Sequence, residues 1–411
     1  MGKIITTIQN RFDGGMSEFR YFKGNGFSVS KGFDTFENPD KISPVRTLTS
    51  DITGTGIGNL LVGSDGAFYG LGATAANPTT NSQLYKKSDY GSAWTALSAE
   101  STGSSALNFD LFIEYPSNGV REIFCSGLAG IAILDKENVA SSDTIALTYT
   151  SITQGAIHPK DDVLYIPYTT STATYIASKN GTGAVNATAL TLPANLIVTS
   201  IVPYGNYLAI ACAPRSVFTL TTTGKTVAFS SQGGSYHSTV YLWDRDSSLA
   251  TLSESIDWGT GLLQVLNVLD ERLIGISNVG GLTTNISDGN SIIIKEYSGS
   301  ALQTIKEIFT KKQTTTSPSV SINPYVNFIN RGKLYFSIDI VGGSTSPKHY
   351  GLWTLSRSKV DGRYVLNIER GATSDNTETS VKAVAVVGDY FTMVHTTNGT
   401  LGISVNSTVF S

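Results

Sequence analysis

The sequence predicts an all-β protein folded as a single β-propeller of about seven four-stranded antiparallel blades. Three observations lead to this prediction. The chain contains 41 glycines, is rich in Ser and Thr, and is only 15% charged, a composition that disfavours helices. Strand-like runs recur in groups of four along the chain. Short turns join consecutive runs within a group, so neighbours in sequence are expected to pair as neighbours in a sheet.

The repeat is clearest in the second half of the chain. Residues 201–258 contain the four strand-like runs IVPYG, YLAIACA, TVYLWDRD and ATLSESIDW. A later group contains VNFIN, KLYFSIDIV, GLWTLSRSK and YVLNIER. Each group opens with an apolar run, a tight turn and a second apolar run, which is typical of a hairpin. Four antiparallel strands in a period of about 42 to 65 residues are typical of propeller blades.

Seven units can be placed along the chain, and they begin near Arg46, Phe109, Ser151, Thr199, Gly261, Ser321 and Val381. The main alternative, a two-sheet sandwich, needs long Greek-key crossovers, whereas these runs follow one another directly. The last unit stops after three strand-like runs. We therefore expect a strand from the N-terminal part to complete it, because a shared blade removes the open edge of the ring.

The candidate for this closing strand lies within residues 27–36, as the outer strand of the last blade. This places an N-terminal arm and closing strand at residues 1–45, and the propeller at residues 46–411. Removal of the residues before Pro39 is then expected to disrupt the fold.

Composition and spacing argue against several classes of function. The net charge is −3 with no basic run, so we expect no binding to nucleic acid. No apolar stretch is long enough for a membrane span, and no apolar leader is visible, so we expect no membrane insertion and synthesis in a cytoplasm. We predict that Cys125 and Cys212 are buried free thiols. The four histidines are scattered, so we expect no metal centre and no cofactor. A calcium ion at Asp244–Asp246 or at Asp288–Asn290 is left open, since either turn could supply oxygen ligands.

Four aromatic residues in expected loops are candidates for contacts with a ligand at the rim: Tyr90, Trp94, Tyr236 and Tyr350. The alternative is that they are packing residues. The segment SDYGSAW at residues 88–94 resembles part of the Asp-box turn of sialidase-like propellers, with Ala93 in the place of a Thr. That resemblance implies that Asp89 caps the turn and that Trp94 packs between strands.

Paired carboxylates could in principle cleave a glycoside. We expect solvated or turn-capping roles instead for the acidic residues near turns, which are Asp110, Glu114, Asp161, Asp162, Asp244, Asp246 and Glu254. No nucleophile elbow of the Gly-x-Ser-x-Gly type occurs in the sequence, and we assign no catalytic residue.

The first forty-five residues carry a distinctive pattern. Residues 9–15 read QNRFDGG, and residues 27–39 read FSVSKGFDTFENP. This opening resembles that of a group of tailed-bacteriophage virion proteins, in which N-R-F-D-G-G leads to S-K-x-F-D-x-F-x-N-P. The resemblance implies a virion protein of the tail or host-adsorption apparatus, with a propeller after the arm. Its partners are then other virion proteins, and we expect it to form a homo-oligomer in the particle.

Three functions therefore follow from the sequence as hypotheses. The first is a structural virion component that acts through protein–protein contacts. The second is a propeller that binds a receptor or a host surface glycan, and the third is an enzyme that degrades surface polysaccharide. We favour the first and predict that the protein is not an enzyme.

Overall fold

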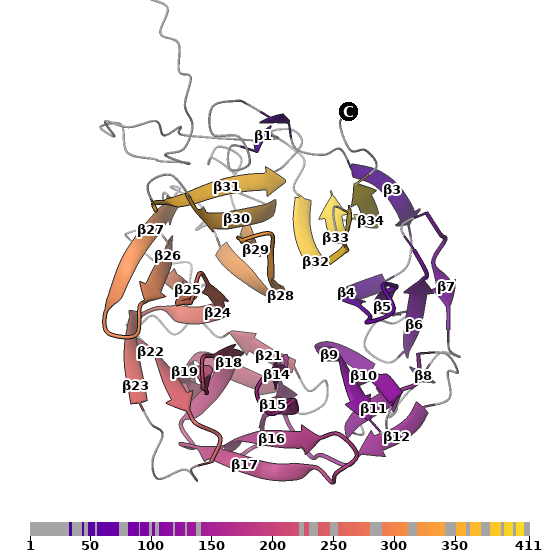
Figure 1. Cartoon of the computed structure of the whole chain (residues 1–411), viewed down its shortest axis with the longest axis horizontal. Coiled ribbons are helices and arrows are strands. Elements are labelled where there is room, and N and C mark those ends of the chain that lie inside the picture. Colours follow the sequence, from indigo (N-terminus) through magenta and orange to yellow (C-terminus); the bar gives the residue numbers. More distant parts are fainter. Residues whose placement is uncertain are drawn as a thin grey trace, which may run out of the picture.

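The structure, a computed structural model, describes residues 33–34, 43–44, 48–53, 56–73, 81–89, 91–97, 101–102, 107–117, 120–127, 130–136, 141–221, 226–229, 237–246, 254–279, 290–310, 319–341, 351–358, 362–370, 379–387, 390–397 and 400–406. Seven antiparallel sheets of four or five strands surround one axis (Figure 1). The prediction of a single all-β propeller is confirmed. In this described part of the chain, the one helical element is the short 3₁₀ turn Arg215–Val217.

We label the sheets blades A to G in chain order. Blade A contains β4 (Gly56–Val62), β5 (Phe68–Ala73), β6 (Asn81–Lys87), β7 (Thr95–Ala96) and β8 (Ser101–Thr102). Blade B contains β9 (Leu107–Ser117), β10 (Val120–Gly127), β11 (Gly130–Leu134) and β12 (Ser141–Ile145). Blade C contains β13 (Ser151–Ile152), β14 (Ala156–His158), β15 (Val163–Thr169), β16 (Thr174–Asn180) and β17 (Asn186–Leu192).

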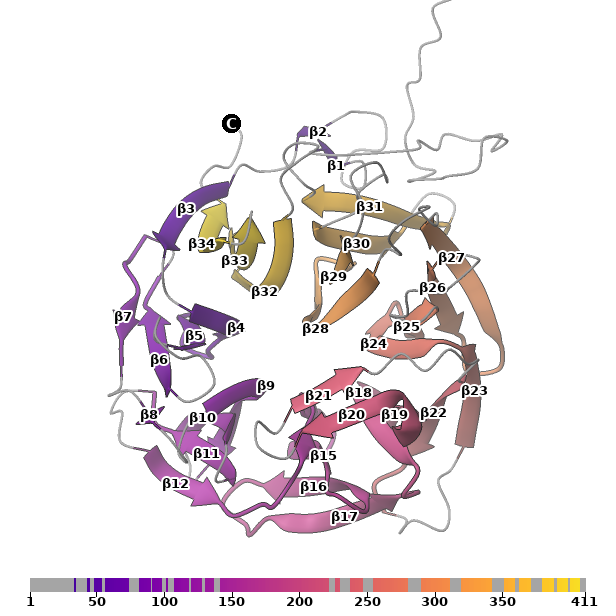
Figure 2. The ribbon, with the colours of Figure 1, turned by 180° about the vertical axis from the view of Figure 1, so that it is seen from behind.

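Blade D contains β18 (Leu196–Tyr204), β19 (Tyr207–Pro214), β22 (His237–Trp243) and β23 (Glu254–Thr260). Between its second and third strands, β20 (Phe218–Thr221) and β21 (Thr226–Phe229) form a separate hairpin, which lies on one face of the ring (Figure 2). Blade E contains β24 (Leu262–Leu269), β25 (Arg272–Val279), β26 (Asn290–Tyr297) and β27 (Leu302–Thr310). Blade F contains β28 (Ser319–Asn330), β29 (Lys333–Val341), β30 (Gly351–Arg357) and β31 (Tyr364–Arg370).

Blade G contains β32 (Thr379–Val387), β33 (Tyr390–Thr397), β34 (Thr400–Asn406) and, at its outer edge, β3 (Leu48–Thr53). β3 pairs antiparallel with β34 in a register that runs from Leu48 opposite Asn406 to Thr53 opposite Gly402. The first and last parts of the chain therefore share one sheet.

The position expected for the closing strand is wrong. The segment 27–36 was expected at the edge of the last blade, but its described part, β1 (Phe33–Asp34), pairs with β2 (Ser43–Pro44). The run that includes Leu48–Thr53 was instead expected to open blade A. A short run with alternating polar and apolar residues can form the first strand of blade A or the outer strand of blade G. The sequence pattern is the same in both positions, so it does not show which sheet the run joins.

Two of the hairpin turns show why the sequence folds locally as expected. Asp270 and Glu271, between β24 and β25, have φ values of 49° and 63°. Arg331 and Gly332, between β28 and β29, have φ values of 51° and 73°. Two successive residues at positive φ make the tight turn whose twist matches that of antiparallel strands. The turn at Arg331–Gly332 lies between the runs VNFIN and KLYFSIDIV, where the sequence predicts it.

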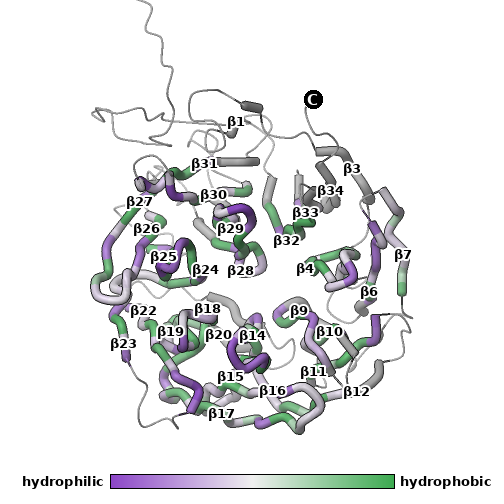
Figure 3. The backbone as a smooth tube through the Cα atoms, in the orientation of Figure 1, coloured by the Kyte–Doolittle hydropathy of each residue, from purple (hydrophilic) through white to green (hydrophobic). Residues whose placement is uncertain are grey.

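The hydrophobic core is divided among the interfaces between neighbouring blades. For each pair of neighbouring blades, the buried apolar residues form a separate cluster. Figure 3 shows hydrophobic positions in green on the strands around the ring. Between blades D and E, for example, Ala209 and Trp258 pack with Leu263. The interface that closes the ring is also apolar, since Phe68 of blade A packs with Val394 of blade G.

Two smaller expectations concern the cysteines and membrane spans. Cys125 in β10 and Cys212 in β19 are buried free thiols, as predicted, and burial raises the pKa of each. Within the described residues, no helix has the length and apolar character needed to cross a membrane.

Truncation from the N-terminus should locate the strand that closes the ring. Deletion of residues 1–46 leaves β3 in place, so we expect the melting temperature to change by only a few degrees. Deletion of residues 1–54 removes the outer strand of blade G and should lower the melting temperature by on the order of 10 °C or prevent folding. Thermal denaturation followed by circular dichroism measures both, and equal melting temperatures for the two truncations would refute the assignment of β3.

Candidate functional site

The innermost strands of the blades surround a central channel. Its larger chamber has a volume of about 520 Å³ and is lined by residues of β4, β9, β14, β18, β24, β28 and β32. A smaller chamber of about 200 Å³ lies next to it and contains Asp110, Gln264 and Tyr325 in its wall. The two chambers share the wall residues Thr153, Gln154, Thr199, Pro324 and Tyr325. The two chambers are therefore adjacent.

Polar side chains on the inner strands bind the backbone of neighbouring blades. Gln154 of blade C bridges to Phe112 of blade B with both ends of its amide, because Nε2 donates to the carbonyl oxygen and Oε1 accepts from the backbone N–H, each at 3.0 Å. Thr153 Oγ1 donates to the carbonyl of Val198 in blade D at 3.0 Å. A buried polar side chain is tolerated when its hydrogen bonds are made, and here each bond also joins two blades.

The series continues around the ring. Thr199 Oγ1 in blade D donates to the carbonyl of Leu263 in blade E. Asn267 Nδ2 in blade E donates to Asn327 Oδ1 in blade F at 2.8 Å. We call these inter-blade hydrogen bonds around the channel the polar belt. The polar belt joins the inner strands of neighbouring blades through N–H and O–H donors of the channel wall.

One hydrogen bond crosses the channel between blades that are not neighbours. The hydroxyl of Tyr325 on β28 donates to Oδ1 of Asp110 on β9. The register of β28 shifts between Asn323 and Asn327, so the intervening residues form a bulge that brings Tyr325 to the axis. Asn323 holds this bulge, since its Oδ1 accepts from the N–H of Tyr325 at 3.0 Å and its Nδ2 donates to the carbonyl of Val381 in blade G at 3.0 Å.

The environment of this contact changes the acidity of both groups. Burial is the main cause that raises the pKa of Asp110 from 3.8 to about 6, and the hydrogen bond from Tyr325 opposes that rise. Burial also raises the pKa of Tyr325 well above its usual value, so its hydroxyl stays protonated and donates at neutral pH. Asp110 therefore titrates in a range where small changes of pH alter the charge in the channel.

Only one of the four predicted rim contacts can be placed. Trp94 is 9% exposed and packs among apolar residues of blades A and G. It is a core residue and not a rim contact, because its ring fills the interface where the propeller closes. Tyr90, Tyr236 and Tyr350 lie outside the described residues.

The Asp-box interpretation of residues 88–94 agrees with the local geometry. Asp89 Oδ1 accepts from the backbone N–H groups of Gly91 and Ser92 at 2.8 and 2.9 Å. The side chain of Ser92 is the main cause that lowers the pKa of Asp89. The aspartate caps the turn and the tryptophan packs, which is the structural role that the resemblance implies.

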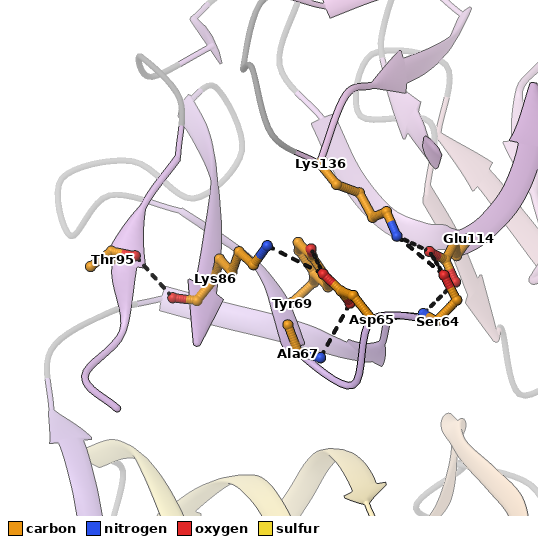
Figure 4. Close-up of polar contacts among 8 residues, drawn as sticks. All are labelled: Ser64, Asp65, Ala67, Tyr69, Lys86, Thr95, Glu114 and Lys136. Atoms are coloured by element: carbon orange, nitrogen blue, oxygen red, sulfur yellow. Dashed lines mark hydrogen bonds and ion pairs between the residues drawn. The ribbon is translucent and has the colours of Figure 1, made fainter. Parts of the chain in front are cut away.

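Three of the seven acidic residues considered for catalysis bind groups at turns, and these are Glu114, Asp161 and Asp244. Glu114 accepts from the N–H of Ser64 at 2.7 Å and pairs with Lys136, beside the neighbouring pair of Asp65 with Tyr69 and Lys86 (Figure 4). The contact of Ser64 with Glu114 ties blade A to blade B, whereas Asp65, Tyr69 and Lys86 all belong to blade A.

Asp161 and Asp244 have comparable roles at two other turns. Asp161 accepts from the hydroxyl of Tyr165 at 3.1 Å and pairs with Arg245 at 3.0 Å. Asp244 Oδ1 accepts from the backbone N–H of Asp246 at 3.1 Å and caps its own turn. The expectation of a turn-bound role is wrong for Asp110, which lies within β9 and faces the channel.

Sequence reasoning missed Tyr325 and Gln264 as site residues. The only local signal for Tyr325 is the preceding Pro324 inside a strand-like run, since proline within a strand often marks a bulge. Gln264 has no local signal that separates it from other polar residues of β24. Among the described residues, no group of three or more His, Cys, Asp or Glu could hold a metal ion.

Known proteins resemble this chain in fold and not in sequence family. No protein-family model and no curated protein matches the chain. The β-propeller domain of Cps50 (Swd1) from Myceliophteria thermophila is similar, with a TM-score of 0.50 and 10% identity over 89% of this chain and 100% of that domain. The fold is a β-propeller. The propeller domain of the Trilobed protease from Pyrococcus furiosus has a TM-score of 0.49 and 12% identity over 86% of this chain and 96% of that one. Identities this low are evidence of a shared fold and not of a shared function.

The stability of the propeller should depend on the protonation of Asp110. Its folded-state pKa of about 6 lies above the value of 3.8 for a solvated carboxyl, so it stabilises the fold below pH 4 and this stabilisation is lost as the pH rises through 6. The shift corresponds to at most about 3 kcal/mol. The variant Asp110→Asn should lose this part of the pH dependence. Urea denaturation of both proteins at pH 4.5 and pH 7.5 measures the difference, and parallel pH profiles would contradict the assignment.

Proposed function

We propose that the protein is a structural component of a bacteriophage virion, in the tail or host-adsorption apparatus, and that it acts through protein–protein contacts and not by catalysis. Support for a virion role comes from residues 9–15 and 27–39, which resemble the opening of tailed-phage virion proteins. The single structural observation that carries the proposal is the position of β3. Because the ring is completed by Leu48–Thr53, the segment with the resemblance precedes every strand of the seven blades.

This arrangement suits a protein that presents a rigid disc and connects it to a neighbour. Each of the seven sheets serves as one blade, and β3 seals the ring by joining blade G. In this proposal, contacts with other virion proteins or with other copies of the chain come from the first 47 residues. Several copies around the tail axis would follow from the closed symmetry that homo-oligomers usually adopt.

Binding of a receptor or a host surface glycan is the second hypothesis. One of its four candidate residues, Trp94, is packed in the core and cannot contact a ligand at the rim. Because Trp94 is buried, the structural virion role is better supported than binding of a receptor or glycan.

Assembly into particles tests the proposed function directly. Phage particles produced with the full chain should retain the protein after purification, as detected by immunoblot. The chain that lacks residues 1–46 should fold but be reduced at least about tenfold in the particles, which corresponds to a loss of 1.4 kcal/mol or more in binding. Asp257→Asn, an exposed substitution on β23, serves as the control and should be incorporated normally. Absence of the full chain from particles would refute the virion role.

A further inference from the structure

The wall of the larger chamber carries half-buried apolar side chains from six of the seven blades. Each of them packs partly in an interface between blades, and each also lines the channel. We call this set the apolar collar, and it consists of Val62, Ile113, Ile157, Val202, Phe328 and Val386. Blade E contributes Asn267, which belongs to the polar belt. Apolar surface that remains in contact with water favours a partner that covers it.

The exposed side chain of Ile329 extends this apolar surface. Among the described residues it is the one exposed large hydrophobic side chain, with 39% of its surface accessible, and it lines the same chamber. Its strand, β28, ends at Asn330, directly before the turn at Arg331 and Gly332. Val62, another wall residue, is likewise the last residue of β4. The collar therefore lies toward the face of the ring that carries the first turn of each blade.

The backbone of the inner strands offers hydrogen-bonding groups as well. Each inner strand pairs with one other strand only, so its second edge faces the channel. On such an edge, every second residue directs its N–H and C=O groups away from its own sheet. Side chains of the polar belt bind some of these groups, at Phe112, Val198 and Leu263. A peptide supplies both donors and acceptors to a strand edge, whereas a hydrocarbon supplies neither.

One segment of the chain has the chemistry of such a peptide. Residues 3–12 read KIITTIQNRF, with three isoleucines, two threonines, one phenylalanine and no glycine or proline. β-Branched and aromatic residues favour an extended strand, and the isoleucines supply the apolar surface that would cover the collar. The same ten residues carry two positive charges, at Lys3 and Arg11, and no negative one.

The turns beside the collar carry a small excess of negative charge. In the described turns between the first two strands of the blades, the charged residues are the basic Lys160 and Arg331 and the acidic Asp65, Asp161, Asp162, Asp270 and Glu271. Lys86 and Arg245 pair with two of these acids, Asp65 and Asp161. Asp270 and Glu271 are exposed next to each other on blade E. A basic peptide is therefore favoured at this face over an acidic one.

The N-terminal part of the chain joins the ring at its periphery. β1 contacts β31, the outer strand of blade F, and lies outside that blade (Figure 1). The residues between Phe12 and Phe33 span up to about 70 Å when fully extended. A folded chain of this length has a radius of gyration of about 22 Å, so residues 3–12 of one copy can reach the channel of an adjacent copy.

We propose that residues 3–12 of one copy bind the apolar collar of a neighbouring copy, with isoleucine side chains against the collar and the backbone along the edge of an inner strand. The inference rests on the proposed function, in which the first 47 residues make the contacts that hold the protein in the particle, and it names another copy of the chain as the partner. Such a contact is head-to-tail, and it closes into a ring when the rotation between copies allows.

Sedimentation velocity of the purified full chain over a range of concentrations tests the proposal. We expect species of two or more copies to form as the concentration rises. An acetylated peptide of residues 3–12, added in excess, should return the chain to monomers because it occupies the collar. A control peptide in which serine replaces the three isoleucines should leave the association unchanged.

Variants of the full chain locate the contact on both partners. Ile329→Arg removes exposed apolar surface and adds a positive charge, so it should weaken the association at least about tenfold. Thr304→Arg, at an exposed position of the outer strand β27, is the matched control and should associate normally. In the N-terminal segment, Ile8→Asp should weaken the association about tenfold, and Thr7→Asp, which adds the same charge at a polar position, should weaken it less. Circular dichroism confirms that each variant is folded.

The proposal is overturned if the full chain stays monomeric at every concentration, if the peptide fails to dissociate the oligomer, or if Ile329→Arg associates as tightly as the unmodified chain. A chain that is monomeric in solution but retained in purified particles refutes the contact between copies and leaves the virion role intact. Association in solution without retention in particles refutes the virion role and leaves the contact between copies intact.

Discussion

The apolar interface between neighbouring blades is the constraint on which the rest of this structure depends. A single four-stranded sheet has two faces, and neither can be left in water when both carry apolar side chains. Each blade therefore buries both faces against its neighbours, and the ring closes only when the last interface, between blades G and A, is as apolar as the others. Trp94 fills that interface, which explains why it is not available at the rim.

The polar belt follows from the same geometry. The inner strands line the channel, where side chains of neighbouring blades come close to one another. Thr153, Gln154 and Thr199 form hydrogen bonds with backbone groups of a neighbouring blade. These bonds use hydroxyl and amide donors of the channel wall, whereas Gln264 Oε1 has no hydrogen-bond partner among the described residues. The chemistry of the chamber is thus a by-product of how the blades are joined.

Much of the fold could be predicted from the sequence, and the candidate site could not. The turns at Asp270–Glu271 and Arg331–Gly332 are local features, and the apolar runs on either side of them identify the hairpins. Asp110 gave no such signal, because a carboxylate in a strand looks like any other polar residue until its neighbours are known. Pro324 marked an irregular strand, but nothing in the run indicated that the bulge would bring Tyr325 to the axis.

The sequence by itself determined the class of fold, the repeated meander and the positions of most turns, since all of these depend on residues within a few positions of one another. Only the tertiary structure decided which strand closes the ring and which side chains meet in the channel. Leu48–Thr53 joins a sheet formed by the other end of the chain, and Asp110 meets Tyr325 across a separation of 215 residues. Contacts at such distances are set by the closure of the whole ring, which no local pattern encodes.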